Sequence, residues 1–293
     1  MSMLARTERD SILDHNHILP TDMSLTVLGS SASSPDAGDA CAGYLVSQGD
    51  ARLLLDCGSG VLGNLRKVST VESLSAIVIS HFHPDHYLDL IPMRYGLRYG
   101  LTEPVRPLVF VPPGGIQFLT RLGTALRDSP TFFARSFRIV EIDPDKILHV
   151  GPFRLSFQRT THDEPTWACA VAGTARLVYT ADTRESIEIE RFAAAADLLV
   201  CESTHTGPAG ALTQGSANHL TSHQAGVLAH KAGARQLMLT HFWPGLDRLV
   251  FAEEAERAYG APVILARPGL VQPVARSSME SHRDSPAPTL LEV

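Results

Sequence analysis

Short apolar runs separated by polar breaks recur along most of the chain and predict a series of β-strands. The second and third runs are joined by Gln48-Gly49-Asp50, which predicts a hairpin. The expected strands cover residues 25–28, 44–46, 52–55, 76–80, 108–111, 153–158, 167–172, 176–180, 198–201, 236–240 and 263–266.

Two later segments show helical patterns instead. In residues 248–259 the apolar side chains recur on one helical face, and Gly260 followed by Pro262 ends the segment. Thr221-Ser222-His223-Gln224 is a capping box that opens a second helix. Strands come first as hairpins and later alternate with helices, so the pattern predicts an α/β fold with two sheets sandwiched between helices.

The two ends of the chain lack this periodicity. Residues 1–22 are polar and are expected to form a flexible arm, whereas residues 274–293 are rich in Ser and Pro and are expected to be disordered. Residues 23–273 are expected to form one catalytic domain. The chain has 293 residues, of which 44% are hydrophobic, and this is ample material for a core.

Charge and cysteine content narrow the class of protein. A formal net charge of −6 gives no broad basic face for nucleic acid, although a local basic groove is left open. The four cysteines contain no CxxC pair and are interpreted as reduced thiols of a cytoplasmic protein. The charged N-terminus does not read as a secretory signal, and no run is long enough to cross a bilayer.

The most informative segment is His81-Phe82-His83-Pro84-Asp85-His86, directly after the strand expected at 76–80. Side chains two apart in an extended segment point the same way, so His81 and His83 can bind one ion together. Pro84 then turns the chain and lets Asp85 and His86 face a second ion. Imidazole and carboxylate groups suit zinc, iron or manganese. The alternative, a polar surface loop, does not explain so dense a cluster.

The His-x-His-x-Asp-His pattern resembles the signature of the metallo-β-lactamase superfamily, and the resemblance covers about residues 25–266. It implies an αββα sandwich of two mixed β-sheets flanked by helices. Four further motifs resemble those of the family in the same order. These are Leu53-Leu54-Leu55-Asp56-Cys57-Gly58, Thr161-His162-Asp163, Tyr179-Thr180-Ala181-Asp182-Thr183, in which Ala181 replaces the usual glycine, and Leu239-Thr240-His241-Phe242.

The resemblance implies which residues hold metal. His81, His83 and His162 would bind a first ion, Asp85, His86 and His241 would bind a second, and Asp182 would bridge the two. Asp56 would support a ligand without binding metal. The implied cofactors are two divalent ions, with Zn²⁺ expected and Mn²⁺ or Fe²⁺ as alternatives. Such ions lower the pKa of bound water towards about 7, which makes hydroxide available at neutral pH.

Two further residues are candidates for catalysis beside Asp85. Asn218-His219-Leu220-Thr221 resembles a segment of the ribonuclease Z and phosphodiesterase branch, whose histidine would protonate the leaving oxygen. Glu202 resembles the glutamate that accompanies it. The alternative for His219 is a loop histidine that caps a carbonyl group. The remaining candidates, His149, His205, His223 and His230, are interpreted as solvated or structural.

The loop Gly29-Ser30-Ser31-Ala32-Ser33-Ser34-Pro35 lacks the helix and the glycine spacing of a phosphate-binding loop. We therefore interpret it as a tight loop beside the metal site.

Two features, His219 and an aspartate rather than a cysteine at position 182, favour a dinuclear phosphodiesterase. Such an enzyme would use a bridging hydroxide on a small phosphodiester such as a cyclic nucleotide. About 20 residues separate His162 from Asp182, too few for the exosite arm of ribonuclease Z, so tRNA precursors are expected to be poor substrates.

A lactonase or thioesterase is the alternative enzyme, and a non-catalytic metal-binding protein is the alternative class. We expect a small-molecule substrate, no stable nucleic-acid partner and no membrane, and the resemblance implies a homodimer.

Overall fold

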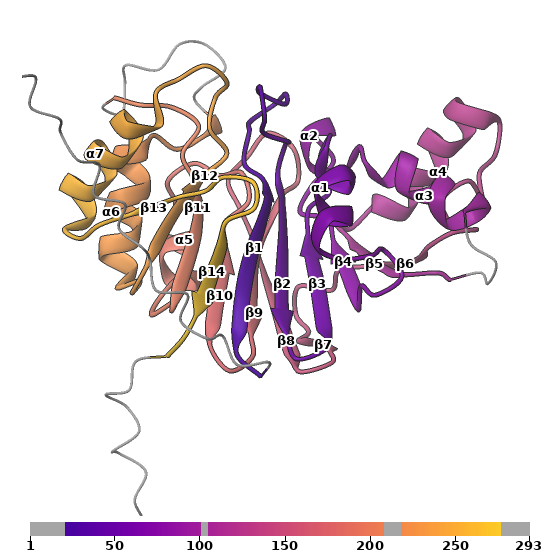
Figure 1. Ribbon diagram of the computed structural model, residues 1–293, viewed down its shortest axis with the longest axis horizontal. Helices are drawn as coiled ribbons and strands as arrows, with labels where there is room; N and C mark the ends of the chain where they lie inside the picture. Colours follow the sequence, from indigo (N-terminus) through magenta and orange to yellow (C-terminus); the bar gives the residue numbers. More distant parts are fainter. Residues whose placement is uncertain (1–20, 101–104, 208–217, 277–293) are drawn as a thin grey trace, which may run out of the picture.

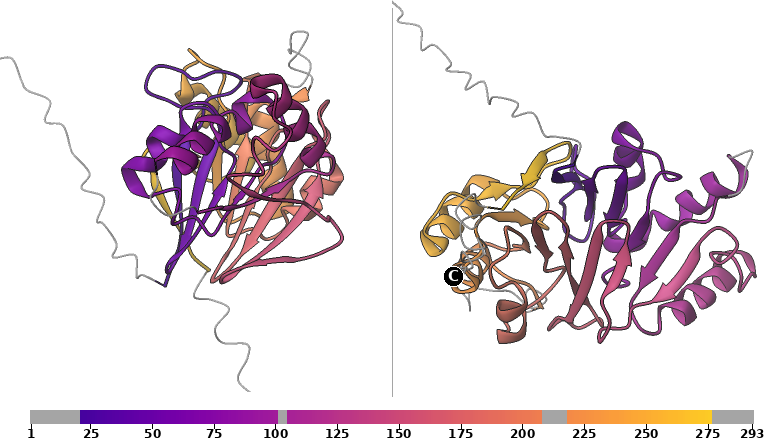
Figure 2. Two further views of the ribbon diagram at one scale, coloured as in Figure 1. Left: turned by 90° about the vertical axis from the view of Figure 1, so that its right-hand side faces the viewer. Right: turned by 90° about the horizontal axis from the view of Figure 1, so that it is seen from below.

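The computed structural model describes residues 21–100, 105–207 and 218–276. Two seven-stranded sheets lie face to face, with helices on their outer sides (Figures 1 and 2). The sandwich predicted from the alternation of strands and helices is therefore confirmed.

The first sheet has the strand order β14-β1-β2-β3-β4-β5-β6. Its neighbours are antiparallel from β14 to β3 and parallel from β3 to β6, so the sheet is mixed. The strands are β1 (Met23–Gly29), β2 (Gly43–Gln48), β3 (Ala51–Leu55), β4 (Ala76–Val78), β5 (Leu108–Val111), β6 (Arg138–Glu141) and β14 (Val271–Val274).

The second sheet has the order β13-β12-β11-β10-β9-β8-β7 and is also mixed. Strands β7 to β10 are antiparallel neighbours, whereas β10 to β13 are parallel. The strands are β7 (Leu148–Val150), β8 (Phe153–Arg159), β9 (Trp167–Ala172), β10 (Arg176–Tyr179), β11 (Leu198–Glu202), β12 (Leu237–Thr240) and β13 (Ile264–Leu265).

Helices α1 to α4 accompany the first sheet and α5 to α7 the second (Figure 1). They are α1 (Val61–Val68), α2 (Pro84–Tyr87), α3 (Leu90–Tyr99), α4 (Gly115–Arg127), α5 (Ile187–Phe192), α6 (Ser222–Ala232) and α7 (Arg248–Tyr259). The predicted capping box is present at the start of α6, where the Thr221 side chain and Gln224 bond each other's backbone N–H. Among the described residues, no helix is long and apolar enough to cross a membrane.

Alternation along the strands divides the core into two parts. Leu53 and Leu55 of β3 belong to the cluster between the two sheets, whereas Leu54 points to the cluster under α1 and α3. Both faces of the inner strands are buried, which explains their near-continuous apolar sequences. The sandwich thus leaves only strand ends and loops to carry polar chemistry.

The structure adds three strands that the sequence pattern did not predict, β6, β7 and β14. Val274, placed in the disordered tail, is instead the last residue of β14, where it pairs with Met23 and is 2% exposed. The physical reason is that an edge strand needs only one partner, so a weakly patterned segment can form it. Most of the predicted arm and tail, residues 1–20 and 277–293, lies outside the described residues.

Candidate metal centre

The residues predicted to bind metal converge at one edge of the sandwich. His81 follows β4, His162 follows β8, Asp182 follows β10 and His241 follows β12. The remaining three come from the start of α2, where His83 is the N-cap and Pro84 occupies the first turn, so that Asp85 and His86 lie within one turn of it. The carboxyl ends of strands from both sheets therefore build the site.

The donor atoms form two adjoining groups. One comprises His81, His83, His162 and Asp182, the other Asp85, His86 and His241, and within each group the donor atoms lie within 4.8 Å of one another. Asp182 faces both groups. Its Oδ2 lies 3.6 Å from His81 Nε2 and 3.8 Å from His162 Nε2, and its Oδ1 lies 3.4 Å from His86 Nε2 and 3.5 Å from His241 Nε2.

The spacing of these donors fits metal ions. His83 Nδ1 lies 3.3 Å from His162 Nε2, and the Nε2 atoms of His86 and His241 are also 3.3 Å apart. Ligands about 2.0–2.1 Å from zinc at tetrahedral angles are separated by about 3.3 Å. Among the described residues, His81 Nε2 and Asp182 Oδ1 are buried without a hydrogen-bond partner. A cation explains such orphaned polar atoms.

Four of the histidines are held from behind by a hydrogen bond at the other ring nitrogen. Such a bond fixes the tautomer and leaves Nε2 as a lone-pair donor towards the centre. The Nδ1 contacts are His81 with Ser80 Oγ (3.0 Å), His86 with Asp56 Oδ2 (2.7 Å), His162 with the Asn218 carbonyl oxygen (3.1 Å) and His241 with Thr204 Oγ1 (2.9 Å).

Of these supporting groups, the Asp56 carboxylate accepts the most hydrogen bonds. It is fully buried and accepts hydrogen bonds from His86 Nδ1, from the Tyr179 hydroxyl (2.8 Å) and from both the backbone N–H (2.7 Å) and the hydroxyl (2.8 Å) of Ser80. The supporting place inferred for Asp56 is thus the one that the structure shows. The nearby Gly58 packs so closely that an added Cβ would lie 1.8 Å from the Asp85 carbonyl oxygen, which explains the glycine in this motif.

Electrostatics prepare the site for cations. Burial alone would raise the pKa of Asp182, but the neighbouring His241, His86 and His81 outweigh it and hold that pKa well below its usual range. Burial likewise opposes ionisation of Asp85, and His86 and His241 again lower the net pKa. Burial depresses the pKa of His81 well below its usual value, whereas at His86 burial is outweighed by the carboxylates of Asp182, Asp85 and Asp56, which raise the pKa well above its usual value. Ionised carboxylates and neutral imidazole are the forms that bind metal, so a cation that binds here would displace a proton from His86.

His219 and Glu202 lie beside this centre and contact each other. Glu202, at the end of β11, is 1% exposed, and its Oε1 lies 3.1 Å from His219 Nδ1. Burial lowers the pKa of His219, but the Glu202 carboxylate outweighs it and raises the pKa to about 9. Nδ1 of His219 is also 3.8 Å from Asp182 Oδ2. Nδ1 of His219 is therefore held by a carboxylate rather than by a carbonyl group.

Two supports of the centre were missed by sequence reasoning. The Thr204 hydroxyl bonds both Glu202 Oε2 (2.7 Å) and His241, and so connects the two parts of the site. The Ser33 backbone N–H donates to Asp85 Oδ2 at 2.7 Å, which confirms that the loop at 29–35 lies beside the metal site. A threonine two positions after Glu202 carried no recognisable signal, and a backbone N–H carries none in any sequence.

Outside the centre, His230 has a structural contact, as predicted. Its Nδ1 lies 3.1 Å from the Tyr259 carbonyl oxygen and joins α6 to α7. No disulfide joins the four cysteines, all of which lie in described ranges and are buried.

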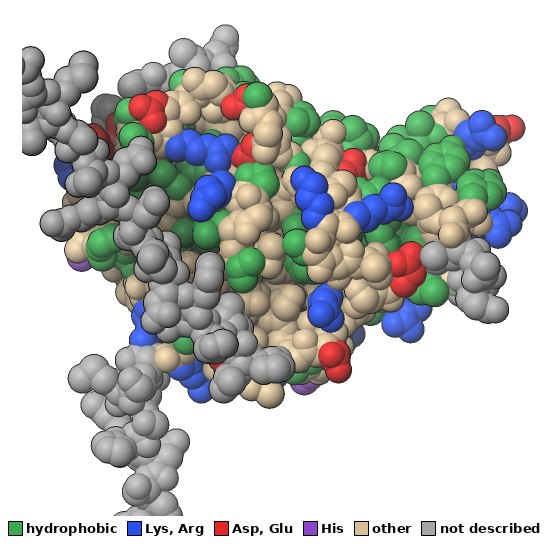
Figure 3. Space-filling model, in the orientation of Figure 1, with side chains coloured by type: hydrophobic (Ala, Val, Ile, Leu, Met, Phe, Trp, Pro, Cys, Tyr) green, Lys and Arg blue, Asp and Glu red, His purple; other side chains and the backbone are tan. Residues whose placement is uncertain are grey.

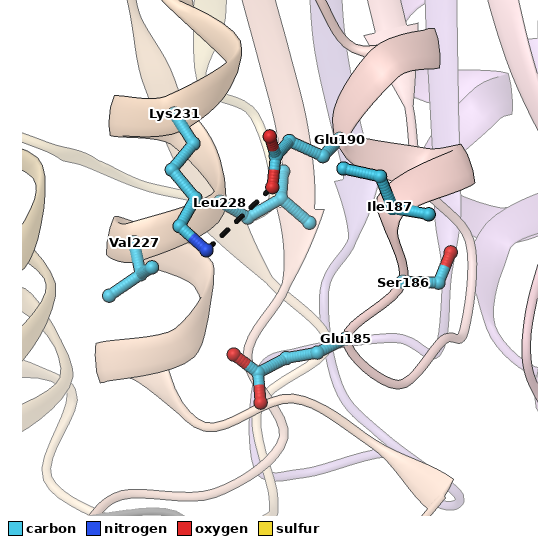
Figure 4. Close-up of a pocket in the computed structure, with 7 residues that line it drawn as sticks. All are labelled: Glu185, Ser186, Ile187, Glu190, Val227, Leu228 and Lys231. Carbon is cyan, nitrogen blue, oxygen red and sulfur yellow. Dashed lines mark ion pairs between the residues drawn. The ribbon is translucent and has the colours of Figure 1, made fainter.

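A separate cavity of about 340 Å³ opens between α5 and α6 (Figure 4). The Lys231 ammonium and the Glu190 carboxylate face each other across it at 3.8 Å. Its lining residues are Glu185, Ser186, Ile187, Glu190, Val227, Leu228 and Lys231. None of the seven donors lines this cavity, so it is distinct from the candidate metal centre.

Comparison of the chain with known proteins agrees with its fold, its motifs and the geometry of its donor atoms. The family described as the beta-lactamase superfamily domain matches residues 51–242. The chain belongs to the metallo-β-lactamase superfamily.

Three proteins illustrate the similarity. The "probable metallo-hydrolase YhfI" of Bacillus subtilis is 32% identical over 85% of this chain and 99% of its own, and the crystal structure of YhfI matches with a TM-score of 0.76 at 30% identity, over 86% and 99% of the two chains. Ribonuclease Z of Salinispora arenicola is 29% identical over 83% of this chain and 93% of its own. Unliganded yeast PDE1 shares the fold, with a TM-score of 0.68 at 12% identity over 86% and 99% of the chains.

Proposed function

We propose that this metallo-hydrolase cleaves small phosphodiesters at a centre of two divalent metal ions, expected to be zinc. The observation that carries the proposal is the pair of donor groups with Asp182 between them, one carboxylate oxygen facing each group. The pairing of His219 with Glu202 at the rim adds a proton donor for the alkoxide that leaves such a phosphodiester. The similarity to ribonuclease Z, whose name describes action on a phosphodiester, supports the same substrate class.

Each residue then has a defined task. Divalent cations held by the seven donors would lower the pKa of a water molecule towards about 7 and neutralise charge on the phosphoryl oxygens. Asp85, whose Oδ2 lies 3.2 Å from His241 Nε2 and accepts the Ser33 N–H, helps to hold one cation and orients the nucleophile. His219 keeps its Nδ1 on Glu202 and presents its other ring nitrogen as the donor of a proton to the leaving oxygen.

The test of this proton transfer compares two leaving groups. His219→Ala should lose about 10²- to 10⁴-fold in rate on adenosine 3′,5′-cyclic monophosphate, whose alkoxide needs a proton to depart. It should lose far less on bis(p-nitrophenyl) phosphate, because p-nitrophenolate leaves without one. His230→Ala removes a histidine bound to a carbonyl group far from the centre and serves as the matched control.

Metal content is measured in the same His219→Ala sample, because His219 also lies near Asp182 and His241. Equal losses on the two substrates would reject the role in proton transfer. Loss of an ion would instead make His219 a ligand.

The face of the molecule shown in Figure 3 does not favour long RNA as a substrate. On the face shown in Figure 3, Lys and Arg side chains are scattered among Asp and Glu rather than gathered into one stripe. The interval between His162 and Asp182 holds only the antiparallel hairpin of β9 and β10. Precise cleavage of a 3′-extended tRNA at rates above those for cyclic nucleotides would contradict this part of the proposal.

The substrate class itself is tested with a panel of a cyclic nucleotide, an oligonucleotide, a lactone and an acyl thioester, with zinc and manganese supplied separately. Turnover of the cyclic nucleotide is the expected result. Turnover of only the lactone or the thioester would overturn the phosphodiesterase assignment, and metal binding without turnover of any compound would make the protein a binder.

A further inference from the structure

A row of aromatic rings leads from the candidate metal centre to the surface. The ring centroid of His241 lies 5.4 Å from that of His219, His219 lies 6.3 Å from His205, and His205 lies 5.9 Å from Trp243. The side chains of His241 and His219 are 3% and 15% exposed, whereas Trp243 is 46% exposed. The row therefore extends from the reactive groups to the solvent.

The outer pair of this row is stacked and held in place. The planes of His205 and Trp243 differ by only 29°. The backbone of His205 is bonded on both sides, to the Leu220 carbonyl oxygen (3.4 Å) and from the Ser222 N–H (2.8 Å). The backbone N–H of Trp243 donates to the Thr204 carbonyl oxygen (3.4 Å). An exposed indole that is already stacked, on a backbone that is itself hydrogen-bonded, loses little conformational freedom when a ligand covers it.

The turn that carries Trp243 is also tied to the reactive side of the molecule. The Gly245 N–H donates to Asp36 Oδ2 at 3.1 Å, and the Ala32 N–H donates to the Phe242 carbonyl oxygen at 2.9 Å. These bonds join the turn to the loop whose Ser33 N–H holds Asp85. Thr204 lies between Glu202 and His205 in the sequence, and its hydroxyl bonds both His241 and Glu202. One side chain therefore supports both the row of rings and the glutamate that holds His219.

We infer that Trp243, backed by His205, is a platform on which a planar base of the substrate stacks while its phosphate lies at the metal centre. The inference rests on the proposed phosphodiesterase function and narrows the substrate class to nucleotide-like phosphodiesters. A base is joined to its phosphate through one sugar, and His205 and His219 lie between Trp243 and Asp182 in the row. Aromatic side chains bind any base through its π-face, so the platform selects for a base without selecting which one.

The test uses two phosphate monoesters that differ only in the base, adenosine 5′-monophosphate and ribose 5-phosphate, as inhibitors of the metal-loaded enzyme. Trp243→Ala should raise the inhibition constant of adenosine 5′-monophosphate by roughly 5- to 150-fold. The constant for ribose 5-phosphate should not change, and Trp243→Phe should retain most of the affinity for the nucleotide. On cyclic nucleotide, KM should rise in Trp243→Ala with little change in kcat.

A control and a second readout separate stacking from other effects. Leu249→Ala removes a 65% exposed apolar side chain from α7 without removing an aromatic ring, and it should leave both inhibition constants unchanged. The chain has two tryptophans, so in Trp167→Phe the fluorescence reports Trp243 alone, and adenosine 5′-monophosphate but not ribose 5-phosphate should quench it.

Equal affinity of the wild-type enzyme for the two monoesters, or an unchanged constant for the nucleotide in Trp243→Ala, would overturn the platform. Base-dependent binding and quenching in a protein that hydrolyses no phosphodiester would refute the proposed function and leave the platform standing.

Discussion

Asp56→Asn tests whether the residues behind the ligands tune metal binding. The carboxylate accepts four hydrogen bonds, three of them at Oδ2 and one, from the Ser80 backbone N–H, at Oδ1. An amide has one acceptor oxygen, so keeping it at the Oδ2 position sets its NH₂ group against the Ser80 N–H. At least one bond to a charged group is lost, which costs about 1.5–3 kcal/mol of folding free energy. The weakened support of His86 should also lower metal affinity by about 10- to 100-fold, or about 1.4–2.7 kcal/mol.

Zinc affinity is measured by competition with a fluorescent chelator, and folding free energy by urea unfolding of the metal-free protein. Asp39→Asn is the matched control. Asp39 is also a buried carboxylate, bonded to Ser30 and Arg248, but it contacts none of the seven donors. It should lose stability without losing zinc affinity. If Asp56→Asn loses stability but binds zinc as tightly as the wild type, the reasoning that Asp56 acts through His86 is refuted.

Three further predictions concern packing, thiols and the reaction. Gly58→Ala should lower the free energy of unfolding in urea by about 3 kcal/mol, because the new Cβ meets the Asp85 carbonyl oxygen. Gly63→Ala in α1, where nothing lies within 4 Å, should raise it by about 0.5–1 kcal/mol. Equal effects of the two substitutions would contradict the close approach at Gly58. Burial raises the pKa of the Cys41 thiol to about 12, and the other three cysteines are also buried, so thiolate is scarce at pH 8. Iodoacetamide should therefore modify no cysteine in the native protein and all four in denaturant. Rapid labelling of the native protein would contradict this. Asp85→Ala should abolish turnover with an unchanged circular dichroism spectrum, and retained hydrolysis would remove Asp85 from the reaction.

The inner parts of the fold could be predicted from the sequence because their signals are local. Both faces of strands such as β4 are buried, so each shows a continuous apolar run, and α7 has a regular apolar face with a glycine after it. The outer strands escaped prediction. Arg138–Glu141 alternates between exposed and half-buried residues, and Val271–Val274 contains Pro273, so neither segment resembles a buried strand.

The metal donors were predictable because each sits in a short motif at a strand end, but the contacts that organise them were not. Ser33 and Asp85, or Thr204 and His241, meet only through the fold, and one partner of the first pair is a backbone N–H. The structure also shows why glycine suits position 181 in the family pattern. Ala181, where glycine is usual, has φ 51°, a left-handed conformation that glycine adopts more readily than alanine.

The measurement that tests the central claim most directly is a metal titration. Protein freed of metal with a chelator is titrated with zinc, and separately with manganese. The metal bound per chain is determined by inductively coupled plasma mass spectrometry. The account predicts saturation at about two ions per chain, because Asp182 faces two groups of donors. In Asp182→Ala the two ions should bind more weakly than in the wild type. Saturation of the wild-type protein at one ion under excess of either metal would contradict the two-ion centre.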